Sequence, residues 1–150
     1  MTTVITRSHR ETVELGRAFG AGLRPGDVVA LSGNLGTGKT TLVKGICEAL
    51  GVTTHVASPT FTMVSEHHAR GVAVVHIDLY RVRSQKEVAE LGLEEYFNDR
   101  TICLVEWPEP ILDFLPPRYF EARLGYGDSD EERHITIEEK VVEREVRALK

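Results

Sequence analysis

Residues 33–40 read Gly-Asn-Leu-Gly-Thr-Gly-Lys-Thr, a complete G-x-x-x-x-G-K-[ST] phosphate-binding loop. The apolar run 28–31 before the loop is typical of a buried strand, and residues 41–50 after it have helical spacing. A strand, a glycine loop and a helix in this order form the unit that phosphate binding requires. The stretch therefore predicts an α/β nucleotide-binding domain.

Each part of the loop has a chemical role. Glycine accepts a positive φ, so the backbone N–H groups can turn inward around a phosphate, and the helix adds its positive dipole end. We expect Lys39 to reach the outer phosphates and the Thr40 hydroxyl to bind Mg²⁺. The other loop residues expected to contact the nucleotide are Asn34, Leu35, Gly36, Thr37, Gly38 and Thr41.

Length and composition indicate one globular domain spanning residues 1–150. The charged share of 27% and the hydrophobic share of 41% are ordinary for a soluble protein. No apolar run approaches the ~20 residues of a membrane span, and residues 1–10 lack the apolar core of a signal peptide. The formal net charge of −5 argues against autonomous binding to nucleic acid, which needs clustered Lys and Arg. We expect no membrane partner.

The two cysteines, Cys47 and Cys103, form no C-x-x-C pair. Each lies in an apolar stretch of an expected helix or strand, so we expect both to be small core residues. A chain without a disulfide framework fits a reducing compartment, and we expect a cytoplasmic protein.

The rest of the chain alternates strands and helices. Ser8 and Glu11 have the S-x-x-E form of a capping box, which predicts a helix from there to about Arg24. Further helices are expected at 85–91, 93–97 and through Val142, Val146 and Leu149, and strands at 2–6, 62–68, 72–78, 101–105, 119–124 and 134–138. The region around Pro108, Pro110, Pro116 and Pro117 is expected to be a loop. This order predicts a three-layer P-loop NTPase fold with a mixed, largely parallel central sheet.

Two expected strands end in carboxylates, and ligands of α/β folds bind beyond such carboxyl ends. Residues 101–106 form an apolar strand that ends in Glu106, the pattern of a Walker B acid that completes the Mg²⁺ shell. The alternative for Glu106 is a carboxylate that only caps the strand. The same pattern occurs at residues 74–78, which end in Asp78.

Asp78 has two interpretations that the sequence leaves open. It could orient or deprotonate the attacking water, or lie close to the metal. It could equally be a buried carboxylate paired with Arg81 or Arg83. His76 lies on the same face of the strand as Asp78, and we expect it to be a hydrogen-bonded structural histidine.

Together these motifs resemble the TsaE family of bacterial P-loop ATPases, formerly called YjeE. The resemblance rests on blocks in a family-specific order and spacing: Gly-Asn-Leu-Gly-Thr-Gly-Lys-Thr-Thr at 33–41, Ser-Pro-Thr-Phe at 58–61, His-Ile-Asp-Leu-Tyr-Arg at 76–81, Glu-Leu-Gly at 90–92 and Val-Glu-Trp at 105–107. It covers about residues 8–125 and leaves the last quarter of the chain without a diagnostic motif.

The resemblance implies a role in the threonylcarbamoyladenosine modification of tRNA. The protein would bind ATP and Mg²⁺, act on a TsaD–TsaB-like complex, and meet tRNA only through that complex. As an ATPase it would be weak alone and dependent on its partners.

The resemblance also assigns residues. Lys39 would hold the phosphates, and Thr40 and Glu106 would hold Mg²⁺. Thr60 would be a switch residue, although spacing alone favours an ordinary turn there, and Asp78 would be an acid near the γ-phosphate. Trp107 would lie beside the nucleotide, and the segment from Thr6 to His9 would receive the adenine.

Three other functions compete with this one. A small GTPase would need an Asn-Lys-x-Asp motif and an Asp-x-x-Gly switch, and neither occurs in the sequence. A small-metabolite or nucleotide kinase would need an arginine-rich lid, for which Arg81, Arg83 and Arg100 are candidates. A non-hydrolysing module that uses ATP only to gate docking would carry nearly the same residues as an ATPase.

Overall fold

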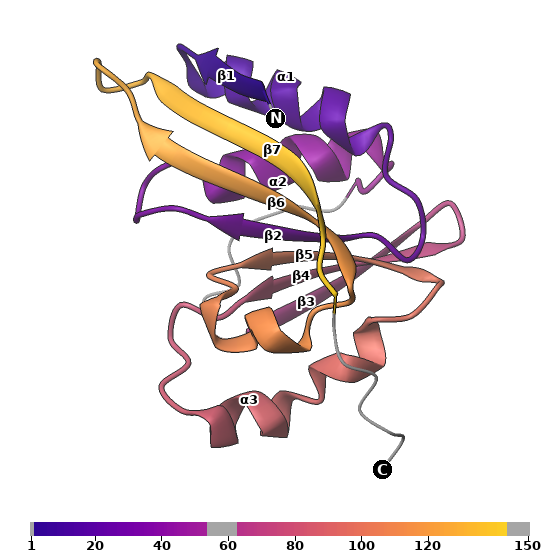
Figure 1. The fold of residues 1–150 in the computed structure, drawn as a ribbon. Coiled ribbons are helices and arrows are strands. Elements are labelled where there is room, and N and C mark those ends of the chain that lie inside the picture. The colour runs from indigo at the N-terminus through magenta and orange to yellow at the C-terminus, as the bar shows by residue number, and fades with distance from the viewer. Residues whose placement is uncertain (1, 54–62, 144–150) are drawn as a thin grey trace.

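The computed structural model describes residues 2–53 and 63–143. It is a three-layer α/β fold around one seven-stranded sheet of order β1-β7-β6-β2-β5-β4-β3 (Figure 1). The four inner strands β6, β2, β5 and β4 are parallel to one another, whereas β3, β7 and β1 add antiparallel pairings at the two sides. The predicted mixed sheet with a parallel centre is confirmed.

The elements follow the predicted order. The strands are β1 (Thr2–Thr6), β2 (Val28–Ser32), β3 (Val64–Ala69), β4 (Val72–Asp78), β5 (Thr101–Glu106), β6 (Arg118–Tyr126) and β7 (Arg133–Val141). The helices are α1 (His9–Gly20), α2 (Lys39–Ala49) and α3 (Gln85–Leu91), with the 3₁₀ helices η1 (Leu93–Tyr96) and η2 (Glu109–Phe114). No helix among the described residues is long and apolar enough to cross a membrane.

The Ser8 half of the expected capping box is present at the start of α1, and the Glu11 carboxylate reaches back to Arg7, one residue before the N-cap. Ser8 accepts a hydrogen bond from the Glu11 N–H at 3.1 Å, and the Glu11 carboxylate accepts from the Arg7 N–H at 2.9 Å. The expected end of this helix at about Arg24 was wrong, because α1 ends at Gly20. Glycine is a poor helix former, and after Gly20 the bonds tighten to the i→i−3 type, from Gly22 to Phe19 and from Leu23 to Gly20.

Other boundaries differ in detail. The hairpin strands β6 and β7 are longer than expected, and the proline-rich region expected to be a loop contains the 3₁₀ helix η2. Pro108 is the N-cap of η2. Proline is tolerated there because the backbone N–H at the start of a helix has no partner within the helix. The expected C-terminal helix falls mainly on residues 144–150, outside the described part.

The core has two halves because alternate residues of β2 face opposite sides of the sheet. Val29 and Leu31 pack with α2, whereas Val28 and Ala30 pack with α3 and η2. Cys47 and Cys103 are buried as expected, and burial raises the pKa of each thiol to about 12. Figure 1 shows α1 and α2 over one face of the sheet and α3 on the other.

Glycines bring α1 and α2 into direct backbone contact. A Cβ atom on Gly45 would lie 2.1 Å from the Val13 carbonyl oxygen, and one on Gly16 would lie 2.4 Å from the Leu42 carbonyl oxygen. No side chain fits at either position without separating the helices. Because α2 begins at the phosphate-binding loop, this contact also fixes the direction in which the helix leaves the loop.

We predict that Gly45→Ala destabilises the protein by about 1–3 kcal/mol, the usual cost of overpacking. Helix propensity alone would make the variant more stable, because alanine is a better helix former than glycine by about 1 kcal/mol. A loss of stability therefore points to the close contact between the helices. Urea unfolding measures the change. Gly22→Ala is the control, because its Cβ would lie 3.7 Å from its nearest neighbour, an ordinary contact. Equal stability of the two variants would contradict the proposed helix contact.

Candidate nucleotide-binding site

A cleft of about 740 Å³ opens where the parallel strands β2, β4 and β5 end. Its walls come from the phosphate-binding loop, α1, the ends of β4 and β5, and the β6–β7 hairpin. The lining residues are His9, Thr12, Leu35, Gly36, Gly38, Lys39, Thr40, Thr41, Met63, Asp78, Tyr80, Arg81, Glu106, Trp107, Asp130, Glu131 and Arg133. The position agrees with the rule that α/β folds bind ligands beyond the carboxyl ends of their strands.

The loop has the backbone that its glycines predict. Gly33, Gly36 and Gly38 have φ of 146°, 78° and 98°. Gly33 also permits close approach, because a Cβ there would lie 2.4 Å from the Leu124 carbonyl oxygen of β6. Asn34 and Thr37 are not among the residues that line the cleft. Thr37 is buried, and its hydroxyl donates to the carbonyl of the exposed Asn34 at 2.7 Å, a hydrogen bond within the loop.

Lys39 is almost fully buried, with 5% of its surface exposed. Its ammonium donates to the carbonyls of Gly33 at 2.6 Å and Asn34 at 2.9 Å. Burial lowers the pKa of Lys39, and the negative charges of Glu106 and Asp78 oppose that shift. An anion bound in the cleft would therefore favour the charged form of this lysine.

Glu106 connects three elements. It is 2% exposed, and its two carboxylate oxygens each accept from the Thr40 hydroxyl at 3.1 Å. One of them also lies 2.5 Å from Nε2 of His76, which is fully buried on β4. Toward an ionised carboxylate, which can only accept, Nε2 is the donating nitrogen. His76 is thus a hydrogen-bonded histidine, as expected.

The Thr40 and Glu106 oxygens fit a magnesium ion. Adjacent ligands of an octahedral Mg²⁺, each about 2.1 Å from the metal, lie roughly 3 Å apart, close to the observed 3.1 Å. Among the described residues no group of three or more His, Cys, Asp or Glu could hold a metal.

Trp107 follows Glu106 and forms one side of the lysine environment. Its ring lies 4.1 Å from the Lys39 ammonium in a cation–π contact, and 4.7 Å from the Tyr80 ring. Its φ of 56° is unusual for a residue other than glycine. Trp107 therefore lies beside the lysine and lines the cleft, and its proximity to a nucleotide stays a prediction.

Asp78 lies opposite Glu106 in the register of β4 and β5, and it lines the cleft. One of its carboxylate oxygens accepts from the Tyr80 N–H at 2.9 Å. Arg81 lines the same cleft, whereas Arg83 and Arg100 are not among its walls. His9 contributes to the wall from the first turn of α1, and Thr60 lies outside the described residues.

The sequence did not predict the contribution of the β6–β7 hairpin. Asp130, Glu131 and Arg133 reach the cleft although they are far from the loop in sequence. Their segment looks like an ordinary exposed acidic turn. Only the pairing of β6 with β2 places it beside the loop, and no local pattern signals that pairing.

Comparisons with known proteins give a consistent result. A sequence model of the family described as "Threonylcarbamoyl adenosine biosynthesis protein TsaE" matches residues 6–135. Proteins of that name are 40% identical over 88% of this chain in Bacillus subtilis (82% of that protein) and 36% identical over 89% in Treponema pallidum (97% of that protein). The crystal structure of YdiB from Bacillus subtilis superposes with a TM-score of 0.78 at 35% identity, covering 93% of this chain and 85% of YdiB.

We predict that His76→Ala destabilises the protein by about 3 kcal/mol, because it removes the closer of the two side chains that hydrogen-bond to the buried Glu106 carboxylate and leaves Thr40 alone to compensate the charge. The free energy of unfolding from urea titration measures the loss. His68→Ala on β3 is the control, since that side chain is 72% exposed and surface changes usually stay within about 0.5 kcal/mol. A loss no larger than that of the control would show that the His76–Glu106 contact contributes little to stability.

Proposed function

The chain belongs to the TsaE family, and from this membership we propose that it takes part in tRNA threonylcarbamoyladenosine biosynthesis as an ATP-binding, Mg²⁺-dependent ATPase. One observation supports the nucleotide chemistry above all others. The ammonium of Lys39 and the Thr40–Glu106 oxygen pair meet in one cleft at the mouth of the phosphate-binding loop. A phosphate chain with a divalent cation is the ligand that suits this charge arrangement.

We propose a role for each site residue, supported by its place in the cleft where the structure describes it. Lys39 binds the outer phosphates, and Thr40 and Glu106 hold Mg²⁺, which when bound neutralises charge on the phosphates. His76 holds the Glu106 carboxylate in place at 2.5 Å. Asp78 orients the attacking water and accepts its proton as the water oxygen attacks the γ-phosphorus and ADP leaves. Trp107 and His9 line the nucleotide space, with Thr60 as a switch residue by family resemblance.

The proposal includes a protein partner. By family resemblance, we propose that hydrolysis serves a TsaD–TsaB-like complex in the cytoplasm. The net charge of −5 favours contact with tRNA through that complex over direct binding.

A kinase remains the second candidate on one observation, the presence of Arg81 in the cleft wall. An arginine there could hold a transferring phosphoryl group. Added acceptor molecules would then stimulate ADP production, whereas an accessory ATPase responds to its protein partners.

We predict that Lys39→Ala weakens ATP binding by about 10–100-fold, because a charged hydrogen bond contributes about 1.5–3 kcal/mol. Hydrolysis stimulated by TsaD–TsaB-like proteins should be lost with it. Calorimetric titration with Mg-ATP and a phosphate-release assay with and without the partners measure the two effects. Lys44→Ala on the same helix is the control for loss of a lysine. Parental affinity in Lys39→Ala would contradict the phosphate assignment.

We predict different defects for the two carboxylates. Asp78→Asn should leave ATP affinity near the parental value and slow partner-stimulated hydrolysis by about 10²–10⁴-fold, the usual contribution of a general base. Glu106→Gln should abolish the Mg²⁺ dependence of nucleotide binding. Magnesium titrations of affinity and rate separate the two variants. Unchanged hydrolysis in Asp78→Asn would reduce Asp78 to a structural carboxylate.

A further inference from the structure

The end of the β6–β7 hairpin contacts the phosphate-binding loop directly. Tyr126 and Arg133 are opposite each other as the last pair of the hairpin ladder. The Tyr126 hydroxyl donates to the Leu35 carbonyl, and Nη2 of Arg133 donates to the Gly36 carbonyl at 3.1 Å. Two consecutive carbonyls of the loop are therefore held by side chains that lie about 90 residues further along the chain.

These contacts fix peptide planes as well as carbonyls. A trans peptide is planar, so its N–H points opposite to its C=O. By holding the Leu35 carbonyl, Tyr126 turns the Gly36 N–H to the other side of the loop. By holding the Gly36 carbonyl, Arg133 fixes the next peptide, whose N–H belongs to Thr37 and bonds to the Asn34 carbonyl at 3.3 Å.

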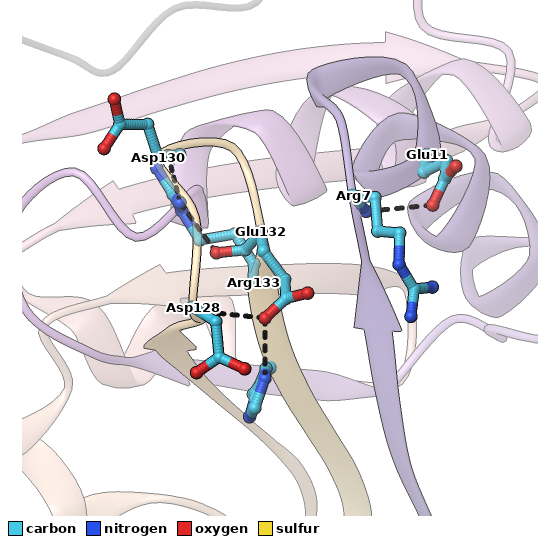
Figure 2. Close-up of polar contacts among 7 residues, drawn as sticks. Arg7, Glu11, Asp128, Asp130, Glu132 and Arg133 are labelled. Carbon is cyan, nitrogen blue, oxygen red and sulfur yellow. Dashed lines mark hydrogen bonds and ion pairs between the residues drawn. The ribbon is translucent and has the colours of Figure 1, made fainter.

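Arg133 is itself rigidly anchored. Its Nη1 donates to the carbonyls of Asp130 at 2.7 Å and Glu132 at 2.8 Å (Figure 2). Its guanidinium also lies 5.5 Å from the Tyr126 ring centre. The turn around it is ordered by Glu132, whose carboxylate accepts from the Asp128 N–H at 2.6 Å and lies 3.3 Å from His134. A planar, multi-donor guanidinium suits this bridge between two backbones, because several donors act in one fixed geometry.

We propose that the β6–β7 hairpin is a nucleotide-positioning element, in which Tyr126 and Arg133 hold the phosphate-binding loop open in its anion-binding conformation. This inference rests on the proposed nucleotide binding and goes beyond it. A loop with three glycines at positive φ has many conformations available when unbound. Restricting them beforehand lowers the entropy that a ligand must otherwise remove. Arg133 then acts through the loop backbone and not as a ligand of the phosphates.

The experiment compares Arg133→Met, Arg133→Lys and Tyr126→Phe with the parent, by calorimetric titration with Mg-ADP and Mg-ATP. We expect about tenfold weaker binding of both nucleotides in both Arg133 variants, and about threefold to tenfold in Tyr126→Phe, which are the effects of losing one hydrogen bond. Arg133→Lys keeps the positive charge but loses the planar set of guanidinium donors, so it should weaken nucleotide binding as much as Arg133→Met does.

Arg118→Met is the matched control. Arg118 lies at the opposite end of β6 and bonds to Glu139 on β7, so its loss removes an arginine contact from the same hairpin without touching the loop. Thermal unfolding without nucleotide should be similar in Arg118→Met and Arg133→Met, while only the Arg133 variant loses affinity.

Each of four results would overturn the inference. Parental affinity in the Arg133 variants would show that the hairpin does not position the loop. If the Arg133 variants bind Mg-ATP more weakly than the parent but bind Mg-ADP equally well, Arg133 contacts the γ-phosphate directly through its charge. Parental affinity in Arg133→Lys would lead to the same conclusion. If the parent and Lys39→Ala fail alike to bind nucleotide, the proposed function itself fails, and the inference with it.

Discussion

The buried carboxylate of Glu106 is the interaction on which the arrangement of the site depends. A charge with 2% exposure is costly unless hydrogen bonds compensate it. Thr40 and His76 supply that compensation from the start of α2 and from β4, so the carboxylate ties a helix and two neighbouring strands together. A site built in this way has the oxygens that are proposed to bind Mg²⁺ already adjacent before any ligand arrives.

The same charge acts on Lys39. Burial lowers the pKa of the lysine, so folding disfavours its charged form, and the negative charges of Glu106 and Asp78 offset part of that effect. Because the pKa is lowered, this unfavourable contribution is fully present at low pH and fades as pH rises through the folded pKa. Bound phosphates would oppose the desolvation further. The cleft therefore holds a lysine whose charged form is destabilised by desolvation, and a bound polyanion would offset that destabilisation. This is an electrostatic reason for the loop to favour phosphates.

The sequence predicted the residues of the site that belong to contiguous motifs. It could not predict the residues that reach the site only through strand pairing between distant segments. Lys39 and Thr40 follow from one contiguous motif, and Glu106 follows from an apolar strand that ends in an acid. His76 was placed correctly because period-two spacing assigns its face, but its partner depends on the register of β4 with β5. Arg133 and Tyr126 carry no local signal, since their contact with the loop follows from the antiparallel return of β7 beside β6. The end of α1 was misplaced for a similar reason. The apolar pattern continues to Leu23 in the sequence, whereas Gly20, the last residue of the helix, lies against the backbone of Ile46 in α2.

The backbone at Trp107 shows how the fold combines these constraints. A tryptophan at φ 56° is strained by about 1–3 kcal/mol and persists only when its surroundings hold it. Its N–H donates to the Leu31 carbonyl at 3.1 Å, which extends the β2–β5 pairing by one residue past Glu106. The left-handed turn then directs the ring away from the sheet, over the Lys39 ammonium and against Tyr80. An ordinary strand conformation would continue the chain along β5 and leave the lysine without this aromatic wall. The strain is therefore localised where it converts the end of a buried strand into one side of the cleft.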